Sequence, residues 1–202
     1  ADSQISRIQR GELTLEDADV KVRQVQVLCR SALERTDGWF DAWGSVPGRP
    51  GVFDPTGLVK TWGVSWAARH LDAFAPGLGY AFGAGGDIPL RPAPDGEPWT
   101  IGIEDPRDRS RVLARIPVTD GAIATSGSAA RGAHILDPTT GLPAEGVLSA
   151  SVIGPSLLWA DVLATTAVAR GASAVDWVHT LHGTSGMLVM ASGEVHRWAN
   201  PA

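Results

Sequence analysis

The alternation of apolar and polar positions along the chain predicts three helices. The first spans about residues 14–36, begins with the acidic residues Glu16 and Asp17, which complement the helix dipole, and ends at a Thr-Asp-Gly sequence. The second spans residues 57–71, where tryptophan and leucine recur at helical spacing. The third spans residues 157–170 and ends at the glycine that follows.

Shorter apolar runs between turn residues predict strands. WTIGIEDP at 99–106 and SRVLARIPV at 110–118 indicate two strands joined by a polar turn, and GMLVMASGEVHRW at 186–198 indicates a terminal hairpin. Two other stretches, GSVPGRPG at 44–51 and the small-residue segment 122–144, have the composition of loops.

The order helix, helix, strands, helix, strands is typical of an α+β fold. A chain of 202 residues is long enough to bury a substantial core, and nothing in its length requires a second one, so we expect a single domain over residues 1–202. A hydrophobic content of 44% and a charged content of 19% are ordinary for globular proteins and do not suggest disorder.

Charge and cysteine usage exclude several classes of function. A net charge of −5 gives no overall attraction for phosphate polymers or anionic lipid, so nucleic acid is not expected as a partner. The single cysteine, Cys29, excludes an internal disulfide and a multi-cysteine zinc site, and its place in the first predicted helix favours a core role.

No transmembrane segment is expected, because the longest apolar run, LLWADVLATTAVA, is interrupted by Asp161. The chain lacks the basic, apolar and small-residue pattern of a signal peptide, which slightly favours the cytoplasm over export. Its opening, ADSQISRIQRGEL, reads like the interior of a protein, so a leader or an opening strand can precede it.

The segment 124–141, ATSGSAARGAHILDPTTG, carries the most specific candidate chemistry. Thr125, Ser126 and Gly127 can offer hydroxyls and backbone amides to a phosphate, with the glycine allowing close approach. A carboxylate at Asp137 could orient the ring of His134 and raise its basicity. The alternative is a histidine at a strand end that is satisfied by backbone groups.

Asp161 and Thr165 lie four residues apart on the third predicted helix and therefore project from one face. A carboxylate and a hydroxyl are hard oxygen ligands that suit Mg²⁺ bound partly by phosphates and water. The alternative is a solvated helix face with no ligand.

A glycine cluster in the middle of the chain could accommodate a pyrophosphate. Adjacent glycines after an apolar tripeptide allow close backbone approach, and the following carboxylate could accept from ribose or adenine groups. The cluster is Gly83, Ala84, Gly85, Gly86 and Asp87. A plain tight turn explains it equally well.

The sequence DPTGLVK at 54–60 could bind an anion at a helix start. Asp54 and Gly57 form the turn before or at the helix, whose free amides attract anions, and Lys60 adds a positive charge. The alternative is a simple capped helix.

Taken together and in this order, these motifs resemble the ApbE family of FAD:protein FMN transferases. The matching stretches cover most of the chain and are SRIQRGEL, TDGWFD, DPTGLVK, GAGGD, WTIGIEDP, ATSG, HILDPTTG and ADVLATT. The resemblance is closest to short bacterial members with the GLVK motif, and it implies a mixed or antiparallel sheet flanked by helices, with an FAD cleft between two lobes. The family's opening strand is not among residues 1–202.

The resemblance also implies roles for particular residues. Asp161 and Thr165 correspond to side-chain ligands of Mg²⁺, with a backbone carbonyl near Val59 completing the set. His134 corresponds to a catalytic histidine that orients or deprotonates the attacking hydroxyl, with Asp137 beside it. Ile135 joins the glycines, hydroxyls and DPTGLVK residues among the FAD-binding positions.

The implied reaction moves FMN from FAD to a Thr or Ser hydroxyl of an acceptor protein and releases AMP. Several positions depart from the usual family residues. Gly83 stands where Asn is common, Thr61 where Gly is common, and Ser128 or Ala129 where an aromatic often follows ATSG. Gly83, Thr61 and the missing opening strand motivate one alternative, an FAD-binding protein without transfer activity. Water in place of the acceptor hydroxyl gives another, an FAD pyrophosphatase that yields free FMN and AMP.

Other classes find little support in the sequence. GxSxG, Walker A and paired CxxC motifs do not occur. Tryptophans can mark a carbohydrate or membrane surface, but Trp62 and Trp66 share a helix face and Trp99 begins a strand, which favours core positions.

Overall fold

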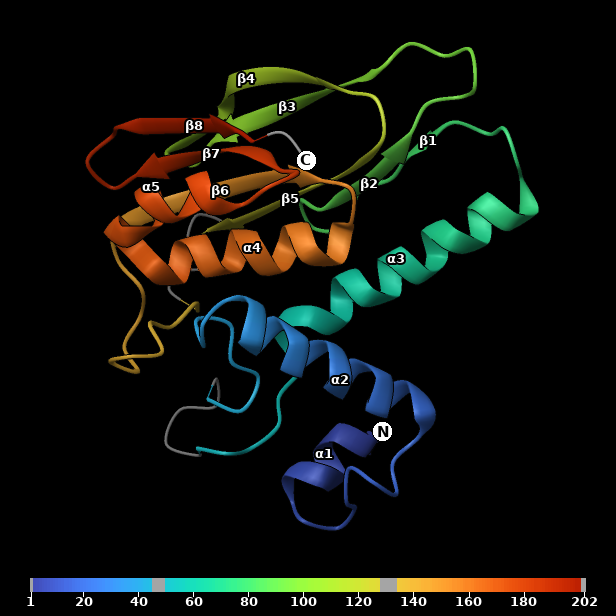
Figure 1. Cartoon of the computed structure of the whole chain (residues 1–202), viewed down its shortest axis with the longest axis vertical. Helices are drawn as coiled ribbons and strands as arrows, with labels where there is room; N and C mark the ends of the chain where they lie inside the picture. The colour runs from blue at the N-terminus through green and yellow to red at the C-terminus, as the bar shows by residue number, and fades with distance from the viewer. Residues whose placement is uncertain (1, 45–49, 128–133, 201–202) are drawn as a thin grey trace.

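The computed structural model describes residues 2–44, 50–127 and 134–200. Its helices are α1 (Gln4–Gln9), α2 (Val20–Arg35), α3 (Thr56–Phe74), α4 (Leu157–Arg170) and α5 (Ala174–Trp177), with short 3₁₀ turns at Gly171–Ser173 and Val178–Thr180. Its strands are β1 (Tyr80–Ala81), β2 (Ile88–Arg91), β3 (Trp99–Asp105), β4 (Asp108–Val118), β5 (Gly121–Gly127), β6 (Val147–Gly154), β7 (Ser185–Met190) and β8 (Val195–Ala199). Figure 1 shows their arrangement.

The described strands form an antiparallel sheet of six strands in the order β1-β2-β5-β6-β7-β8, while β3 and β4 form a separate two-stranded sheet. Every pairing between these strands is antiparallel. The predicted α+β class with an antiparallel sheet and flanking helices is confirmed. The predicted strand pair at 99–118 and the terminal hairpin are also present as β3-β4 and β7-β8.

The larger sheet is covered on both faces (Figure 1). Alternate residues of β5 point in opposite directions, so Ala122 and Ala124 pack in the cluster that contains α4, whereas Ile123 packs with Ile103 and the β3-β4 pair. A strand that is covered on both faces does not show the alternation of apolar and polar residues that marks a half-exposed strand. For this reason part of β5, Gly121–Gly127, was predicted to be loop.

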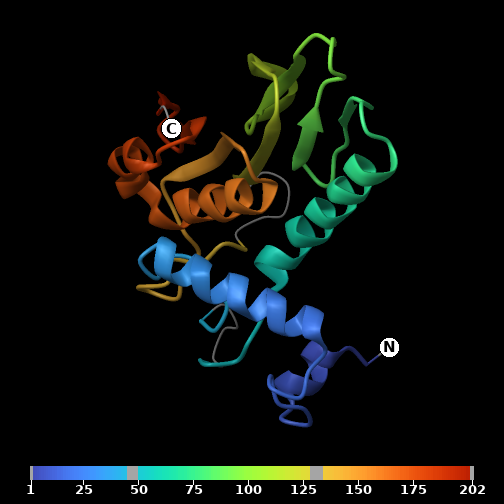
Figure 2. The same ribbon diagram turned by 45° about the vertical axis from the view of Figure 1, so that its right-hand side comes forward.

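Helix α4 lies between the sheet and helices α2 and α3 (Figures 1 and 2). Ala164 and Ala167 pack toward the sheet, whereas Leu158 and Val162 belong to a second cluster with residues of α2 and α3. Cys29 is fully buried in this second cluster, so its predicted core role in a helix is confirmed.

The first helix starts later than predicted. Asp19 caps α2 by accepting a hydrogen bond from the amide of Lys21 at 2.8 Å, and the helix begins at Val20. Asp17 instead closes a turn, in which its amide donates to Thr14 Oγ1. Glu16 and Asp17 therefore lie outside the helix, because the side chains of Thr14 and Asp19 accept the backbone amides of Asp17 and Lys21 ahead of the first helical turn.

The predicted core role of two tryptophans is wrong. Trp66 is 43% exposed on α3, and Trp99 is 39% exposed at the start of β3. Helix α3 extends beyond the body of the molecule (Figure 2), and Phe74 at its end is 84% exposed. Residues 45–49 of the predicted 44–51 loop lie outside the described residues.

Among the described helices, none has the length and apolarity needed to cross a membrane.

Candidate functional site

A cavity of about 700 Å³ opens where the described parts of α3, α4, β3 and β5 meet. It brings together residues predicted from separate motifs along the chain. The predicted site residues that line it are Asp54, Gly57, Lys60, Gly85, Gly86, Thr125, Ser126, Gly127, His134, Ile135, Asp161 and Thr165.

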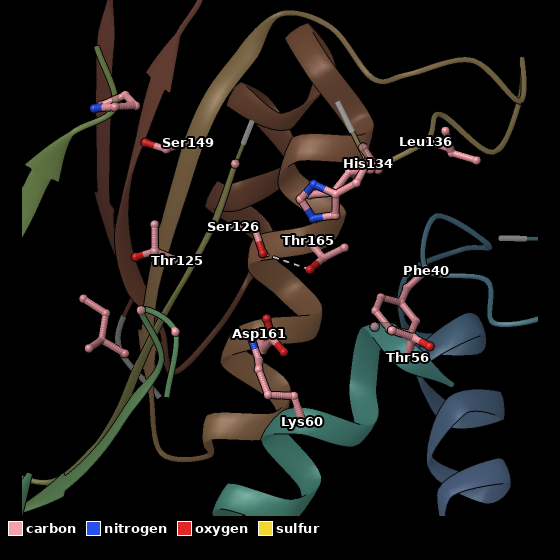
Figure 3. Close-up of a pocket in the computed structure, with 18 of the residues that line it drawn as sticks. Phe40, Thr56, Lys60, Thr125, Ser126, His134, Leu136, Ser149, Asp161 and Thr165 are labelled. Carbon is pink, nitrogen blue, oxygen red and sulfur yellow. Dashed lines mark hydrogen bonds between the residues drawn. The ribbon is translucent and has the colours of Figure 1, made fainter. Parts of the chain in front are cut away.

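Asp161 and Thr165 face this cavity from α4 (Figure 3). Asp161 is only 4% exposed, so the alternative of a solvated helix face is wrong. Each of the two side chains is held from another element. The hydroxyl of Thr61 on α3 donates to Asp161 Oδ2 at 2.9 Å, and Ser126 Oγ on β5 lies 2.9 Å from Thr165 Oγ1.

The end of β5 directs consecutive residues to opposite sides of the sheet. Ser126 faces α4, whereas Thr125 faces the other way and its hydroxyl lies 2.8 Å from Ser151 Oγ. Gly127 follows, and a Cβ there would meet the carbonyl oxygen of Leu148 at 2.3 Å. Glycine at this position is therefore required by the neighbouring strand β6, in addition to any role toward a ligand.

The start of α3 forms one wall of the cavity. Asp54 Oδ1 accepts from both the amide and the hydroxyl of Thr56, and the amides of Leu58 and Val59 donate to the carbonyl of Pro55. Most of the first helical amides are therefore satisfied within the chain, which fits the capped-helix alternative for this motif.

Gly57 lies against the ring of Phe40, since a Cβ would approach that ring to 3.3 Å. Val59, whose carbonyl the resemblance assigns to the metal, is 41% exposed on the first turn of α3 and is not among the residues that line the cavity. The structure thus leaves the two side-chain ligands, Asp161 and Thr165, as the part of the predicted set that faces the cavity.

The glycine cluster forms a tight turn beside the cavity. Gly85 and Gly86 both have positive φ angles, 66° and 98°, and the amide of Ala84 donates to the carbonyl of Asp87 at 2.8 Å. Gly85 and Gly86 line the cavity, whereas Gly83 is outside its lining. The tight-turn alternative thus describes the local geometry, and the turn still presents glycine backbone to the cavity.

Asp87 is completely buried and forms an ion pair with Lys60 of α3. Its Oδ1 also accepts from the amide of Thr125 at 3.3 Å. A buried carboxylate needs such partners, because removal from water is costly for an unpaired charge. Asp87 thus ties the glycine turn to α3 and β5, and the ammonium of Lys60 is held at the cavity rather than extended into solvent.

His134 and Asp137 have separate surroundings. His134 is exposed at the cavity, on the same side of α4 as Thr165 and Ser126 (Figure 3). Asp137 Oδ1 instead accepts from the hydroxyl and the amide of Thr139, each at 2.7 Å, and these hydrogen bonds hold the pKa of Asp137 below its ordinary value. Asp137 shapes the turn after His134 and is not among the cavity-lining residues.

Sequence reasoning missed one whole wall of the cavity. Strand β3 and the turn that follows it contribute Ile101, Gly102, Ile103, Glu104, Asp105 and Pro106. The WTIGIEDP motif marked this strand but gave no indication of which partner it would face. Thr61 was also noticed only as a departure from the usual family residue, although it contacts Asp161.

The comparisons with known proteins agree with this arrangement. The FAD:protein FMN transferase of Vibrio cholerae serotype O1 is 38% identical over 130 residues, which are 58% of this chain and 38% of that protein. The FAD:protein FMN transferase of Salmonella typhimurium is 31% identical over 158 residues, 71% of this chain and 45% of that protein. The chain spans less than half the length of these curated relatives.

Solved structures show the same fold. The ApbE protein of Thermotoga maritima superposes with a TM-score of 0.81 at 26% identity, covering 96% of this chain and 81% of that one. The flavin transferase ApbE of Vibrio cholerae gives a TM-score of 0.79 at 24% identity, covering 98% and 81%. The sequence model of the ApbE family matches residues 47–189, a stretch that contains every cavity-lining motif described above from DPTGLVK to ADVLATT, and the chain therefore belongs to the ApbE family.

Proposed function

We propose that this chain catalyses the Mg²⁺-dependent transfer of FMN from FAD to a threonine or serine hydroxyl of an acceptor protein, with release of AMP. The observation that carries the proposal is one cavity bordered by Asp161, Thr165 and His134, which come from distant parts of the sequence. The curated relatives are named FAD:protein FMN transferases, which supports the transfer of FMN from FAD to a protein.

The lining of the cavity suits a dinucleotide with aromatic rings and a diphosphate. Ile88, Ile101, Ile103 and Ile123 offer apolar surface on the side of β2, β3 and β5. Hydroxyls, glycine backbone and the ammonium of Lys60 also line the cavity. A mostly apolar pocket with a few convergent polar groups is typical of small-molecule sites, whose volumes are about 300–1,000 Å³.

Asp161 and Thr165 fit a hard divalent cation such as Mg²⁺. Both are oxygen donors on one helix face, and Asp161 is a buried carboxylate directed at a cavity. Among the described residues, no three His, Cys, Asp or Glu side chains are grouped so that they could hold a metal by themselves. The site therefore matches a cation bound jointly by protein and substrate phosphates, where it would neutralise charge on the phosphoryl oxygens.

His134 is suited to act on the acceptor. It is exposed at the cavity, where the hydroxyl of a second protein can reach it. In the proposed step His134 accepts the hydroxyl proton while the acceptor oxygen bonds to the phosphorus of the FMN half. The bond from that phosphorus to the bridging oxygen breaks, and AMP leaves with the electron pair.

The test combines FAD, Mg²⁺ and a protein with candidate threonine or serine acceptors, and it measures AMP release and flavin fluorescence on the denatured acceptor. We expect His134→Ala to slow transfer by about 10²- to 10⁴-fold, as for loss of a general base. Asp161→Ala should remove the Mg²⁺-dependent part of FAD binding. His179→Ala and Asp95→Ala serve as controls, because both residues are exposed and outside the cavity.

The same assay separates the alternatives. FMN that appears free rather than on a polypeptide indicates a pyrophosphatase, and a stable FAD complex that releases no AMP indicates a binding protein without transfer activity. Equal Mg²⁺ dependence in the wild type and in Asp161→Ala would contradict the assignment of Asp161.

A further inference from the structure

Thr61 is a buried polar residue whose side chain reaches a proposed metal ligand. It is 0% exposed on α3, and its hydroxyl lies 2.9 Å from Asp161 Oδ2 on α4. The two residues are 100 positions apart in the sequence, so the contact exists only because α3 packs against α4.

The hydroxyl of Thr61 has two candidate acceptors and one proton to donate. The carbonyl of Leu58 lies 3.2 Å away, and Asp161 Oδ2 lies 2.9 Å away. Hydrogen bonds to an ionised carboxylate are shorter and about twice as strong as those between neutral groups. The donor proton of Thr61 is therefore directed mainly at Asp161, and the backbone contact is secondary.

The hydroxyl that donates to Asp161 is supplied by the residue at position 61. The preceding residue, Lys60, is ion-paired with Asp87, so it is already committed to another carboxylate. Of the two proposed ligands on α4, Thr165 is contacted by Ser126 from β5 and Asp161 by Thr61 from α3. Each of the two ligand side chains is thus held by a partner from a different element, α3 for Asp161 and β5 for Thr165.

We propose that Thr61 is a positioning residue that holds the Asp161 carboxylate in the orientation needed to bind a divalent cation. The proposal rests on the proposed function, since it assigns a role in the metal site. Partners of this kind restrict the rotamers of a ligand and keep it pointed at the metal, and their loss usually costs about 10- to 100-fold in metal affinity.

The experiment compares Thr61→Val, which keeps the shape of the side chain without its hydroxyl, with Thr61→Ser, which keeps the hydroxyl. Mn²⁺ serves as the probe, and its uptake is followed by loss of the free-ion EPR signal, with and without FAD. We expect Mn²⁺ to bind about 10- to 100-fold more weakly to Thr61→Val and within about threefold of wild type to Thr61→Ser. Circular dichroism should give a folded protein in both cases.

A purely structural role for Thr61 makes different predictions. It would weaken Mn²⁺ binding equally in the serine and valine variants, or in neither. Thr61→Val should also have no further effect on Mn²⁺ binding in an Asp161→Ala background, because Thr61 acts through Asp161; a further loss there would overturn the proposal. If Thr61→Val does not fold, Thr61→Ala replaces it in the same comparison.

The existence of the metal site and the role of Thr61 can be tested separately. Wild-type protein that takes up no Mn²⁺ at all, with or without FAD, would remove the metal site and with it the proposed function. Wild-type protein that binds Mn²⁺ with the same affinity as Thr61→Val would overturn only the role of Thr61.

Discussion

Buried titratable residues in this protein have contrasting surroundings. Asp87 and Asp161 near the cavity are paired across elements, with Lys60 and Thr61 respectively. Cys29 instead sits among apolar neighbours on α2, where burial raises the pKa of its thiol to about 12. Paired polar groups keep a charge in place for chemistry, whereas an apolar environment suppresses charge and makes a thiol inert.

Cys29 should therefore react slowly with thiol reagents in the native protein. The raised pKa means that the neutral thiol, which is the unreactive form, predominates up to about pH 12. Ellman's reagent at pH 8 should label little of the native protein within minutes. The single cysteine should then be labelled fully after unfolding in guanidinium. Native labelling at the rate of a free cysteine would show that the cluster around Cys29 opens readily.

The cavity depends on turns whose side chains satisfy their own backbone. Asp54 bonds to Thr56 before α3, and Asp137 bonds to Thr139 after His134. In both cases an aspartate two residues upstream accepts from an amide and a hydroxyl of a threonine. This local pattern determines the direction of the chain as it enters or leaves the cavity wall.

The Asp137 carboxyl should titrate below its ordinary pKa in the folded protein. Its folded-state pKa lies below the ordinary value, mainly because of the Thr139 hydroxyl and then the Thr139 amide. The turn is thus stabilised above the ordinary pKa of about 3.9, and that stabilisation is lost as the pH falls through the lower folded-state value. Thr139→Val should raise the pKa of Asp137 toward its ordinary value, as measured by NMR of the carboxyl carbon.

Asp108 provides the internal control for that titration. Its pKa is lowered in the same way by the hydroxyl and amide of Ser110, at the start of β4. Thr139→Val should leave the titration of Asp108 unchanged. An unchanged Asp137 titration in the variant would mean that the hydroxyl of Thr139 does not support the turn in solution.

At the scale of the whole molecule, α4 joins the helical side to the sheet. Its residues belong to both main apolar clusters, one with the sheet and one with α2 and α3, and it also carries Asp161 and Thr165. The packing that stabilises the protein and the packing that places the proposed metal ligands are therefore the same.

This shared helix predicts one cooperative unfolding transition, in line with the single domain expected from length. Leu188→Ala, in the cluster beside the sheet, and Leu58→Ala, in the cluster beside α2, should each lower the free energy of unfolding by about 2–5 kcal/mol. Urea unfolding followed by circular dichroism and by tryptophan fluorescence should give coincident curves for each variant. Two separate transitions in either variant would contradict a single folding unit.

The sequence by itself was sufficient for the longest helices, two strand pairs and the family. Periodicity located α3 and α4 to within a few residues, and the ordered motifs pointed to the ApbE family, because these signals are local and each depends only on neighbouring positions. The same local reasoning failed where two local signals compete. It extended the first helix over Glu16 and Asp17, and it assigned most of a strand of small residues, Gly121–Gly127, to a loop.

Only the tertiary structure decided which residues share the cavity and what each one contacts. Lys60 is paired with Asp87, Asp137 belongs to a turn, the β3 strand forms a wall, and Thr61 reaches Asp161. These contacts join segments tens of residues apart or depend on the side to which a loop turns. They follow from how α3, α4 and the two sheets pack, and packing is determined by the whole chain rather than by any short stretch of it.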